Sequence, residues 1–186
     1  MTGRAAVIAP FGAFLAGVAL LVSGCGYGLS GRSVSLPAHI KVIAVPPLTN
    51  RTADPELERV LTKALQTELS NRGKWKVVQD AAGADVDAVV TGIVVSLTLT
   101  NKAFNEARQA TRVEIGVVAS VEFKDLRDNS KMLWSTPGLV TSDEYPITSG
   151  TVSTDPASYL RQNSDAYQRL ATKFARTIVA AMLEGM

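Results

Sequence analysis

The sequence predicts a two-layer α/β (α+β) sandwich, in which two amphipathic helices pack on one face of a mixed four-stranded sheet. Two observations lead to this fold class. The predicted elements follow one another as strand, helix, three strands and helix. Each helix also carries a single apolar stripe, and a sheet that covers both stripes is the simplest way to bury them.

The first strand and the first helix have clear sequence boundaries. Residues 39–46 form a short apolar run that ends at a pair of prolines, as expected of a strand buried on both faces. Asp54 is a typical N-cap residue, Pro55 suits the first helical position, and Gly73 stands where the helix would end. The apolar residues of this helix recur at three- and four-residue steps and share one face: Leu57, Val60, Leu61, Ala64, Leu65 and Leu69.

Three further strands are predicted in the middle of the chain, after a short extended piece at residues 74–78. Residues 84–100 are rich in β-branched side chains, as in a long strand. Residues 131–142 predict a strand interrupted near Pro137. Between them, residues 111–125 alternate with a period of two, so that one set of side chains points to the core: Val113, Ile115, Val117, Ala119, Val121 and Phe123. The last three strands should pair as antiparallel hairpins.

Asp155 and the proline after it begin a helical region that runs to about Leu183. The aromatic and methionine side chains of this region are interpreted as core residues, so no cofactor is expected. Its apolar stripe consists of Tyr167, Leu170, Ala171, Phe174, Ile178, Ala181 and Met182.

The N-terminal segment has the composition of a secretory signal. Arg4 precedes an uncharged apolar stretch, residues 5–22, and small residues follow. Residues 22–25, Val-Ser-Gly-Cys, resemble the lipobox of bacterial lipoproteins. This resemblance implies that residues 1–24 are a lipoprotein signal peptide and that Cys25 is acylated. The alternative is an uncleaved membrane helix, because the stretch approaches the ~20 residues that span a bilayer; its proline and glycines weaken that alternative.

Charge and residue usage exclude several classes of function. Without Arg4 the mature chain has 18 basic and 17 acidic residues, whereas nucleic-acid-binding proteins normally show a basic bias. A single Cys25 and a single His39 can form neither a disulfide within the chain nor a zinc site. No catalytic motif is present, His39 is expected in a loop, and Asp85 and Asp87 are expected to be solvated strand ends. The chain is therefore predicted not to be an enzyme and to bind no metal.

Four segments together resemble the LPS-assembly lipoprotein family LptE. They are CGYGLSGR, LPAHIKVIAVPPLTNRT, ELERVLTKALQTEL and VDAVVTG. The resemblance implies an outer-membrane lipoprotein, held on the periplasmic side through acylated Cys25, that plugs and helps to assemble the LptD β-barrel as a one-to-one partner. It also implies contact with lipopolysaccharide and assistance in its insertion into the outer leaflet.

The resemblance divides the chain into a signal peptide (1–24), a lipidated tether (25–38) and an LptE-like α/β domain (39–186). The tether is short, at most about 50 Å when extended, which suits a domain held close under its membrane. The first half of the domain also resembles outer-membrane lipoproteins of the curli-transporter and peptidoglycan-synthase-activator type. That alternative stays open, although an activator should need a longer linker.

The segment 100–112 is the candidate lipopolysaccharide-binding site. Lys102, Arg108 and Arg112 could hold lipid phosphates through charge-assisted hydrogen bonds, and Phe104 could meet an acyl chain. Arg161, near the start of the last helix, is a further candidate that the family resemblance suggests. The alternative is a solvated hairpin end with no ligand.

Overall fold

The computed structural model describes residues 36–73, 75–83, 85–147 and 155–184. The predicted signal peptide, Cys25 and most of the tether lie outside the described residues. The elements are β1 (Val42–Ala44), β2 (Thr49–Asn50), α2 (Pro55–Arg72), β3 (Lys76–Val78), β4 (Ala88–Phe104), β5 (Ala110–Asp125), β6 (Lys131–Pro146), α3 (Pro156–Gln162) and α4 (Ser164–Glu184).

The strands form one mixed sheet in the order β3-β1-β4-β5-β6, with β2 paired to β4. β1 pairs in parallel with β3 and β4, and β2 pairs in parallel with β4. β4, β5 and β6 form a long antiparallel meander. The predicted fold class is confirmed. The six strands exceed the expected four by two short ones, β2 and β3, and β3 corresponds to the extended piece predicted at residues 74–78. The expected second helix is divided into α3 and α4.

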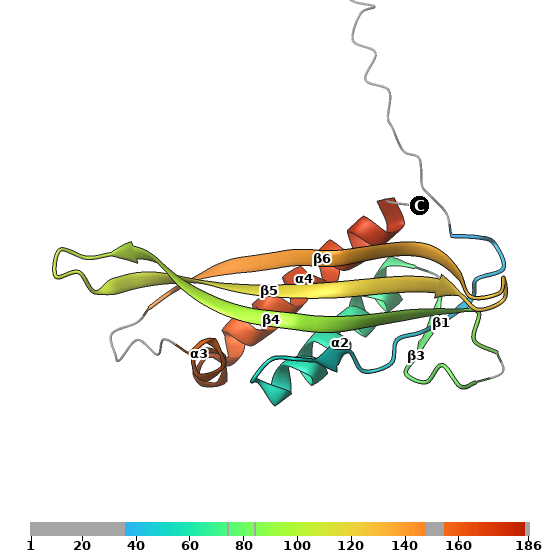
Figure 1. The fold of residues 1–186 in the computed structure, drawn as a ribbon, viewed down its shortest axis with the longest axis horizontal. Coiled ribbons are helices and arrows are strands. Elements are labelled where there is room, and N and C mark those ends of the chain that lie inside the picture. Colours follow the sequence, from blue (N-terminus) through green and yellow to red (C-terminus); the bar gives the residue numbers. More distant parts are fainter. Residues whose placement is uncertain (1–35, 74, 84, 148–154, 185–186) are drawn as a thin grey trace, which may run out of the picture. The chain divides into compact units, whose positions relative to one another are not determined.

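The helices lie on one face of the meander, as Figure 1 shows, and α4 contacts β5, β6 and α2. Their predicted stripes are buried there, apart from Ala64 and Ala181, which are partly exposed. The six inward-pointing residues predicted for β5 are all buried against the helices. Leu36, within the predicted tether, is also buried in this core, so packing begins before residue 39.

β6 is continuous where the sequence predicted an interruption. Ala119 of β5 pairs with Leu139 and Val121 pairs with Thr136, so β6 carries one extra residue at this point. Pro137 lies in this β-bulge, where no ladder hydrogen bond is required of its nitrogen. The proline therefore bends the strand locally without ending it.

A buried polar network at the start of α2 connects this helix to α4. Asp54 is fully buried; its Oδ1 accepts a hydrogen bond of 3.1 Å from the Glu56 backbone N–H, and its Oδ2 accepts one from the Tyr167 hydroxyl. Asn50 Nδ2 donates to the Asp54 carbonyl at 2.7 Å, and the Thr52 hydroxyl donates to Asn50 Oδ1 at 2.8 Å. Burial and the bond to Asp54 raise the pKa of Tyr167, so the hydroxyl keeps its proton. The predicted cap is thus also a contact between helices.

We expect Asp54→Ala to destabilise the fold by about 2–4 kcal/mol, because it removes a cap and leaves the buried Tyr167 hydroxyl without its acceptor. Tyr167→Phe should cost about 1–2 kcal/mol, and the double variant less than the sum of the two. Denaturant unfolding of the three variants measures this coupling.

The exposed cap Asp155, which accepts a hydrogen bond of 2.9 Å from the Ser158 backbone N–H, is the matched control. Asp155→Ala should cost only about 0.5–2 kcal/mol. The network would be contradicted if the two cap variants lost the same free energy of unfolding and the effects of Asp54→Ala and Tyr167→Phe were strictly additive.

Candidate functional site

The segment predicted to bind lipid forms the end of the β4–β5 hairpin, which extends beyond the helices (Figure 1). Asn105 closes the turn: its backbone N–H donates to the Gln109 carbonyl at 2.9 Å, and its Oδ1 accepts from the Gln109 N–H at 2.9 Å. Arg108 lies within the turn at φ 57°, a left-handed conformation that is uncommon for a residue other than glycine. The turn thus holds Arg108 at the outermost part of the hairpin.

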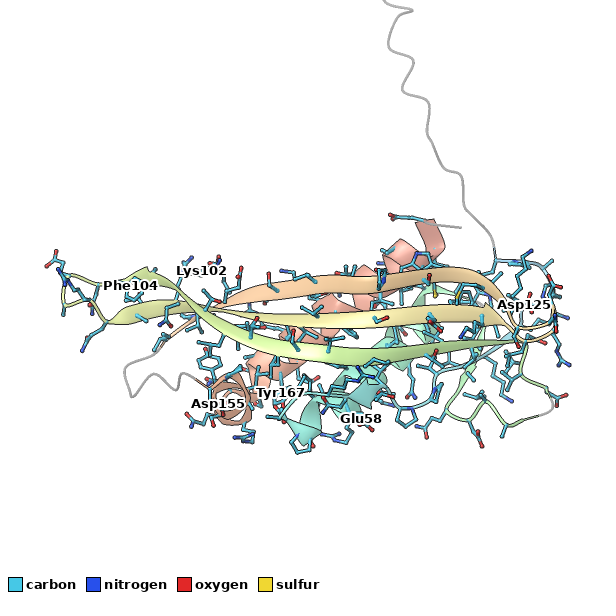
Figure 2. All side chains as sticks on the ribbon, in the orientation of Figure 1. Glu58, Lys102, Phe104, Asp125, Asp155 and Tyr167 are labelled. Atoms are coloured by element: carbon cyan, nitrogen blue, oxygen red, sulfur yellow. The ribbon has the colours of Figure 1, made fainter. Side chains whose placement is uncertain are left out.

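The structure brings four of the five predicted site residues to this hairpin end. Figure 2 shows Lys102 and Phe104 there, and the Phe104 side chain is 60% exposed. Arg108 and Arg112 are exposed as well. The fifth, Arg161, belongs to α3, where its guanidinium donates to Ser158 Oγ at 3.0 Å and lies 3.8 Å from Asp155 Oδ2.

Two of the hairpin cations already have carboxylate partners. Lys102 Nζ lies 3.0 Å from Glu114 Oε1, and Arg112 NH1 lies 3.6 Å from Glu144 Oε2. All four side chains are substantially exposed, so these ion pairs are weak and a phosphate could replace the carboxylates. Arg108 forms no ion pair with the described residues. The hairpin end therefore offers one free cation and two that can change partner.

Strand alternation decides which face these groups occupy. The odd-numbered residues of β5 from Val113 to Phe123 are buried under the helices, so its even-numbered residues, including Arg112 and Glu114, project from the opposite face. We call the opposite face of β4, β5 and β6 the open face. In the paired registers its side chains include Thr91, Ile93, Ser96, Thr98, Thr100, Glu114, Val118, Ser120, Glu122, Lys124, Met132, Ser135, Val140, Ser142 and Glu144.

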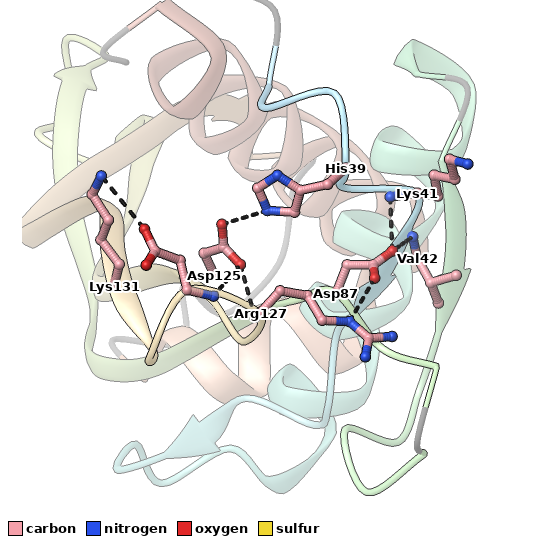
Figure 3. Close-up of polar contacts among 8 residues, drawn as sticks. His39, Lys41, Val42, Asp87, Asp125, Arg127 and Lys131 are labelled. Carbon is pink, nitrogen blue, oxygen red and sulfur yellow. Dashed lines mark hydrogen bonds and ion pairs between the residues drawn. The ribbon is translucent and has the colours of Figure 1, made fainter.

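The end of the sheet opposite the hairpin carries a polar cluster that the sequence did not reveal (Figures 2 and 3). Asp87 Oδ2 accepts hydrogen bonds of 2.9 Å from the backbone N–H groups of Lys41 and Val42, and its Oδ1 accepts one of 2.9 Å from Arg127 Nε. The carboxylate therefore ties the chain before β1 to the turn after β5. The expectation that Asp87 is a solvated strand end is wrong, because these three donors keep it buried; Asp85 is exposed as predicted.

Asp125 makes the second half of this cluster. Its Oδ2 lies 2.7 Å from His39 Nε2, and its Oδ1 accepts from the Arg127 and Asp128 backbone N–H groups at 2.9 and 3.2 Å. His39 lies in a loop, as predicted, with about half of its side chain exposed. Burial alone would raise the pKa of Asp125, but the bonds from His39 and the backbone outweigh it and lower that pKa. These contacts are structural, since each carboxylate is fully occupied by donors from its own chain.

Among the described residues, no group of three or more His, Cys, Asp or Glu side chains is arranged to hold a metal ion. In the same part of the chain, no helix has the length and apolarity that crossing a membrane requires. Within this part of the chain, the exposed cationic hairpin end is an arrangement that suits an anionic, partly apolar ligand.

Comparison with known proteins gives one family and a set of distant structures. The model of the LptE lipopolysaccharide-assembly family matches residues 40–182. No curated protein sequence matches the chain. Among solved structures, the hypothetical protein CT253 from Chlamydia trachomatis is 17% identical, with 77% of this chain and 95% of that chain covered and a TM-score of 0.51. At such identity the likeness concerns the fold alone.

Two lipoproteins are among the other similar structures. Uncharacterized lipoprotein B from Nitrosomonas europaea is 16% identical, with 86% of this chain and 96% of that chain covered and a TM-score of 0.47. Rare lipoprotein B from Shewanella oneidensis is 16% identical, with 74% of this chain and 96% of that chain covered and a TM-score of 0.41.

The Asp87 contacts predict a loss of stability in acid. The backbone N–H groups of Lys41 and Val42, and then Arg127, lower the pKa of Asp87 from 3.8 to about 2. Because the folded-state pKa is the lower one, this stabilisation is complete above about pH 4 and is lost as the pH falls from there through about 2. It amounts to about 2 kcal/mol at most, and solvent around the half-exposed Arg127 reduces it.

Asp87→Asn should therefore destabilise the fold at pH 7 by about 1–2 kcal/mol, and the difference from wild type should shrink towards pH 2. Asp85→Asn, an exposed neighbour, is the control and should change stability little at either pH. Unfolding curves at several pH values measure both. A penalty for Asp87→Asn that stays constant down to pH 2 would contradict the assigned pKa.

Proposed function

Since this chain belongs to the LptE lipopolysaccharide-assembly family, we propose that it plugs an LptD-like β-barrel of the outer membrane and assists lipopolysaccharide insertion. The family is one of non-enzymatic assembly lipoproteins, and this chain is not an enzyme. The match of residues 40–182 to the family model is the observation that carries the proposal, because it extends from two residues before β1 to the last turn of α4.

The lipid anchor of the proposal is Cys25. The apolar stretch, the small residues at positions 23 and 24 and the cysteine together support cleavage after residue 24 and acylation of Cys25. Several acyl chains, at about 0.8 kcal/mol per buried CH₂, would hold the protein durably at the membrane. The family and the lipobox together favour the outer membrane, with the domain on its periplasmic side.

The open face supports the role of a barrel plug. The lumen of a membrane β-barrel is polar. The open face carries mainly hydroxyl-bearing and charged side chains, with apolar ones between them: Ile93, Val118, Met132 and the 64%-exposed Val140. A surface of this composition can pack against a polar wall through many hydrogen bonds around small apolar contacts. The hairpin end, projecting beyond the helices, would then present its cations to lipid A phosphates.

The experiment that tests this function is purification of the tagged full chain from outer membranes. We expect a stable one-to-one complex with a very large outer-membrane β-barrel, and an intact mass that shows an acylated N-terminal Cys25 with residues 1–24 removed. A barrel wall around the plug makes the interface large and slow to dissociate. Recovery of a cell-wall synthase in place of a barrel would reject the proposal, and an intact mass that retains residues 1–24 would reject the anchor.

The hairpin site has its own test in the variant Lys102→Gln, Arg108→Gln and Arg112→Gln. We expect lipopolysaccharide binding to weaken roughly tenfold, because three exposed charges each contribute a fraction of a kcal/mol to 1 kcal/mol. Binding by the wild type should also weaken as salt is raised. The complex with the barrel should persist, because the fold does not depend on these exposed ion pairs.

The matched control removes three cations of α2. Like the hairpin set, these comprise two cations with carboxylate partners and one without. Arg59 and Arg72 are paired with Glu56 and Glu68, while Lys63 is exposed and forms no ion pair with the described residues. Replacing all three by Gln changes the net charge by the same amount. Equal loss of lipopolysaccharide binding in the two triple variants, or no loss in the hairpin variant, would reject the hairpin site.

A further inference from the structure

A cationic groove lies along α4 beside β6, on the side of the sheet that carries the helices. Its volume is about 450 Å³, within the range of small-molecule sites. It is lined by Asp143, Gln168, Arg169, Thr172, Lys173, Arg176 and Thr177. We call it the α4 groove. Asp143 pairs with Ile115, a buried residue of β5, so it faces the helix layer, whereas Glu144 faces the open face with the hairpin cations.

The three cations of the α4 groove share one side of the helix. Arg169, Lys173 and Arg176 are spaced by four and three residues, so they succeed one another on adjacent turns over about 10 Å. Like charges at this spacing destabilise an isolated helix by a small amount. A functional ligand is one reason for a chain to keep them together.

Among the described residues that line the groove, one carboxylate faces these cations. Asp143 Oδ2 lies 3.1 Å from Arg169 NH2, and Asp143 Oδ1 lies 3.4 Å from Lys173 Nζ. The Arg176 side chain forms no ion pair or hydrogen bond with any residue that the structure describes. The lining of the groove therefore carries two positive charges in excess.

The arrangement of donors favours phosphate. Arg169 is held in place by Asp143 and by the Tyr145 ring, whose centroid lies 5.0 Å from its guanidinium carbon. Lys173 also donates to the Ser142 carbonyl, which orients its ammonium towards the groove wall. Guanidinium groups bind phosphate through two parallel hydrogen bonds, and Gln168 and Thr172 add neutral donors nearby.

We propose that the α4 groove binds a ligand carrying at least two phosphate groups, at a site separate from the hairpin end. A single phosphate would neutralise only one end of a charged strip about 10 Å long, whereas two groups would reach both Arg169 and Arg176. Soluble polyphosphates and the head group of a phosphorylated lipid share this chemistry. The proposal does not depend on the function proposed above for the hairpin.

The test is calorimetric titration of the full chain in neutral detergent with tripolyphosphate, and in parallel with micelles of bisphosphorylated lipid A. Three proteins are compared: wild type, Lys173→Gln/Arg176→Gln, and the hairpin triple variant. Arg176→Gln alone is a further variant, since this side chain has no partner in the described structure and its loss should leave the melting temperature unchanged. Citrate, a tricarboxylate, serves as the control anion.

We expect the wild type to bind tripolyphosphate more tightly than it binds citrate. The double variant should bind tripolyphosphate at least tenfold more weakly than the wild type does. Arg176→Gln should weaken it severalfold, and the hairpin variant should bind it as the wild type does. If the wild type binds lipid A but not tripolyphosphate, and the double variant loses the lipid A affinity, the ligand of the groove is a lipid head group. No binding of either probe, equal binding by wild type and double variant, or equal loss in the double and hairpin variants would overturn the proposal.

Discussion

Helices cover only one face of the β4–β5–β6 meander, and this constraint determines most of what the domain can do. The apolar stripes of α2 and α4 require a sheet, and the alternating side chains of β5 supply one apolar face for them. The other face carries mainly hydroxyl-bearing and charged residues, with Ile93, Met132 and two valines among them. A domain built in this way has one side committed to its own stability and one side available to a polar partner.

Buried carboxylates hold this architecture at two places. Asp54 joins the start of α2 to α4 through the Tyr167 hydroxyl, and Asp87 and Asp125 join the chain before β1 to the turn after β5 (Figure 3). Each carboxylate is satisfied by several donors, which makes its burial tolerable. Neither network includes a residue of the β4–β5 hairpin end, whose cations are exposed.

The sequence predicted the elements whose periodicity is strong and missed what depends on distant contacts. The alternation in β5 and the stripes of α2 and α4 correctly identified the core, because burial on one face imposes a regular pattern. The sequence does not predict the break between α3 and α4 at Asn163, since the apolar pattern continues across it. Local rules predict that Asp87 is a strand end and Asp54 a cap, yet their partners Arg127 and Tyr167 lie 40 and 113 residues away. The composition of residues 100–112 predicts the hairpin cations. The α4 groove depends on the packing of α4 beside β6, which the sequence pattern alone does not show.

Site-specific photocrosslinking in living cells, from a probe at Val140, tests the central claim most directly. Val140 is exposed on the open face, so a probe there leaves the helix-packed core undisturbed and reports what lies against that face. The account predicts one dominant crosslink, to a very large outer-membrane β-barrel. A crosslink to a cell-wall synthase or another periplasmic protein, or the absence of any crosslink from this face, would contradict it.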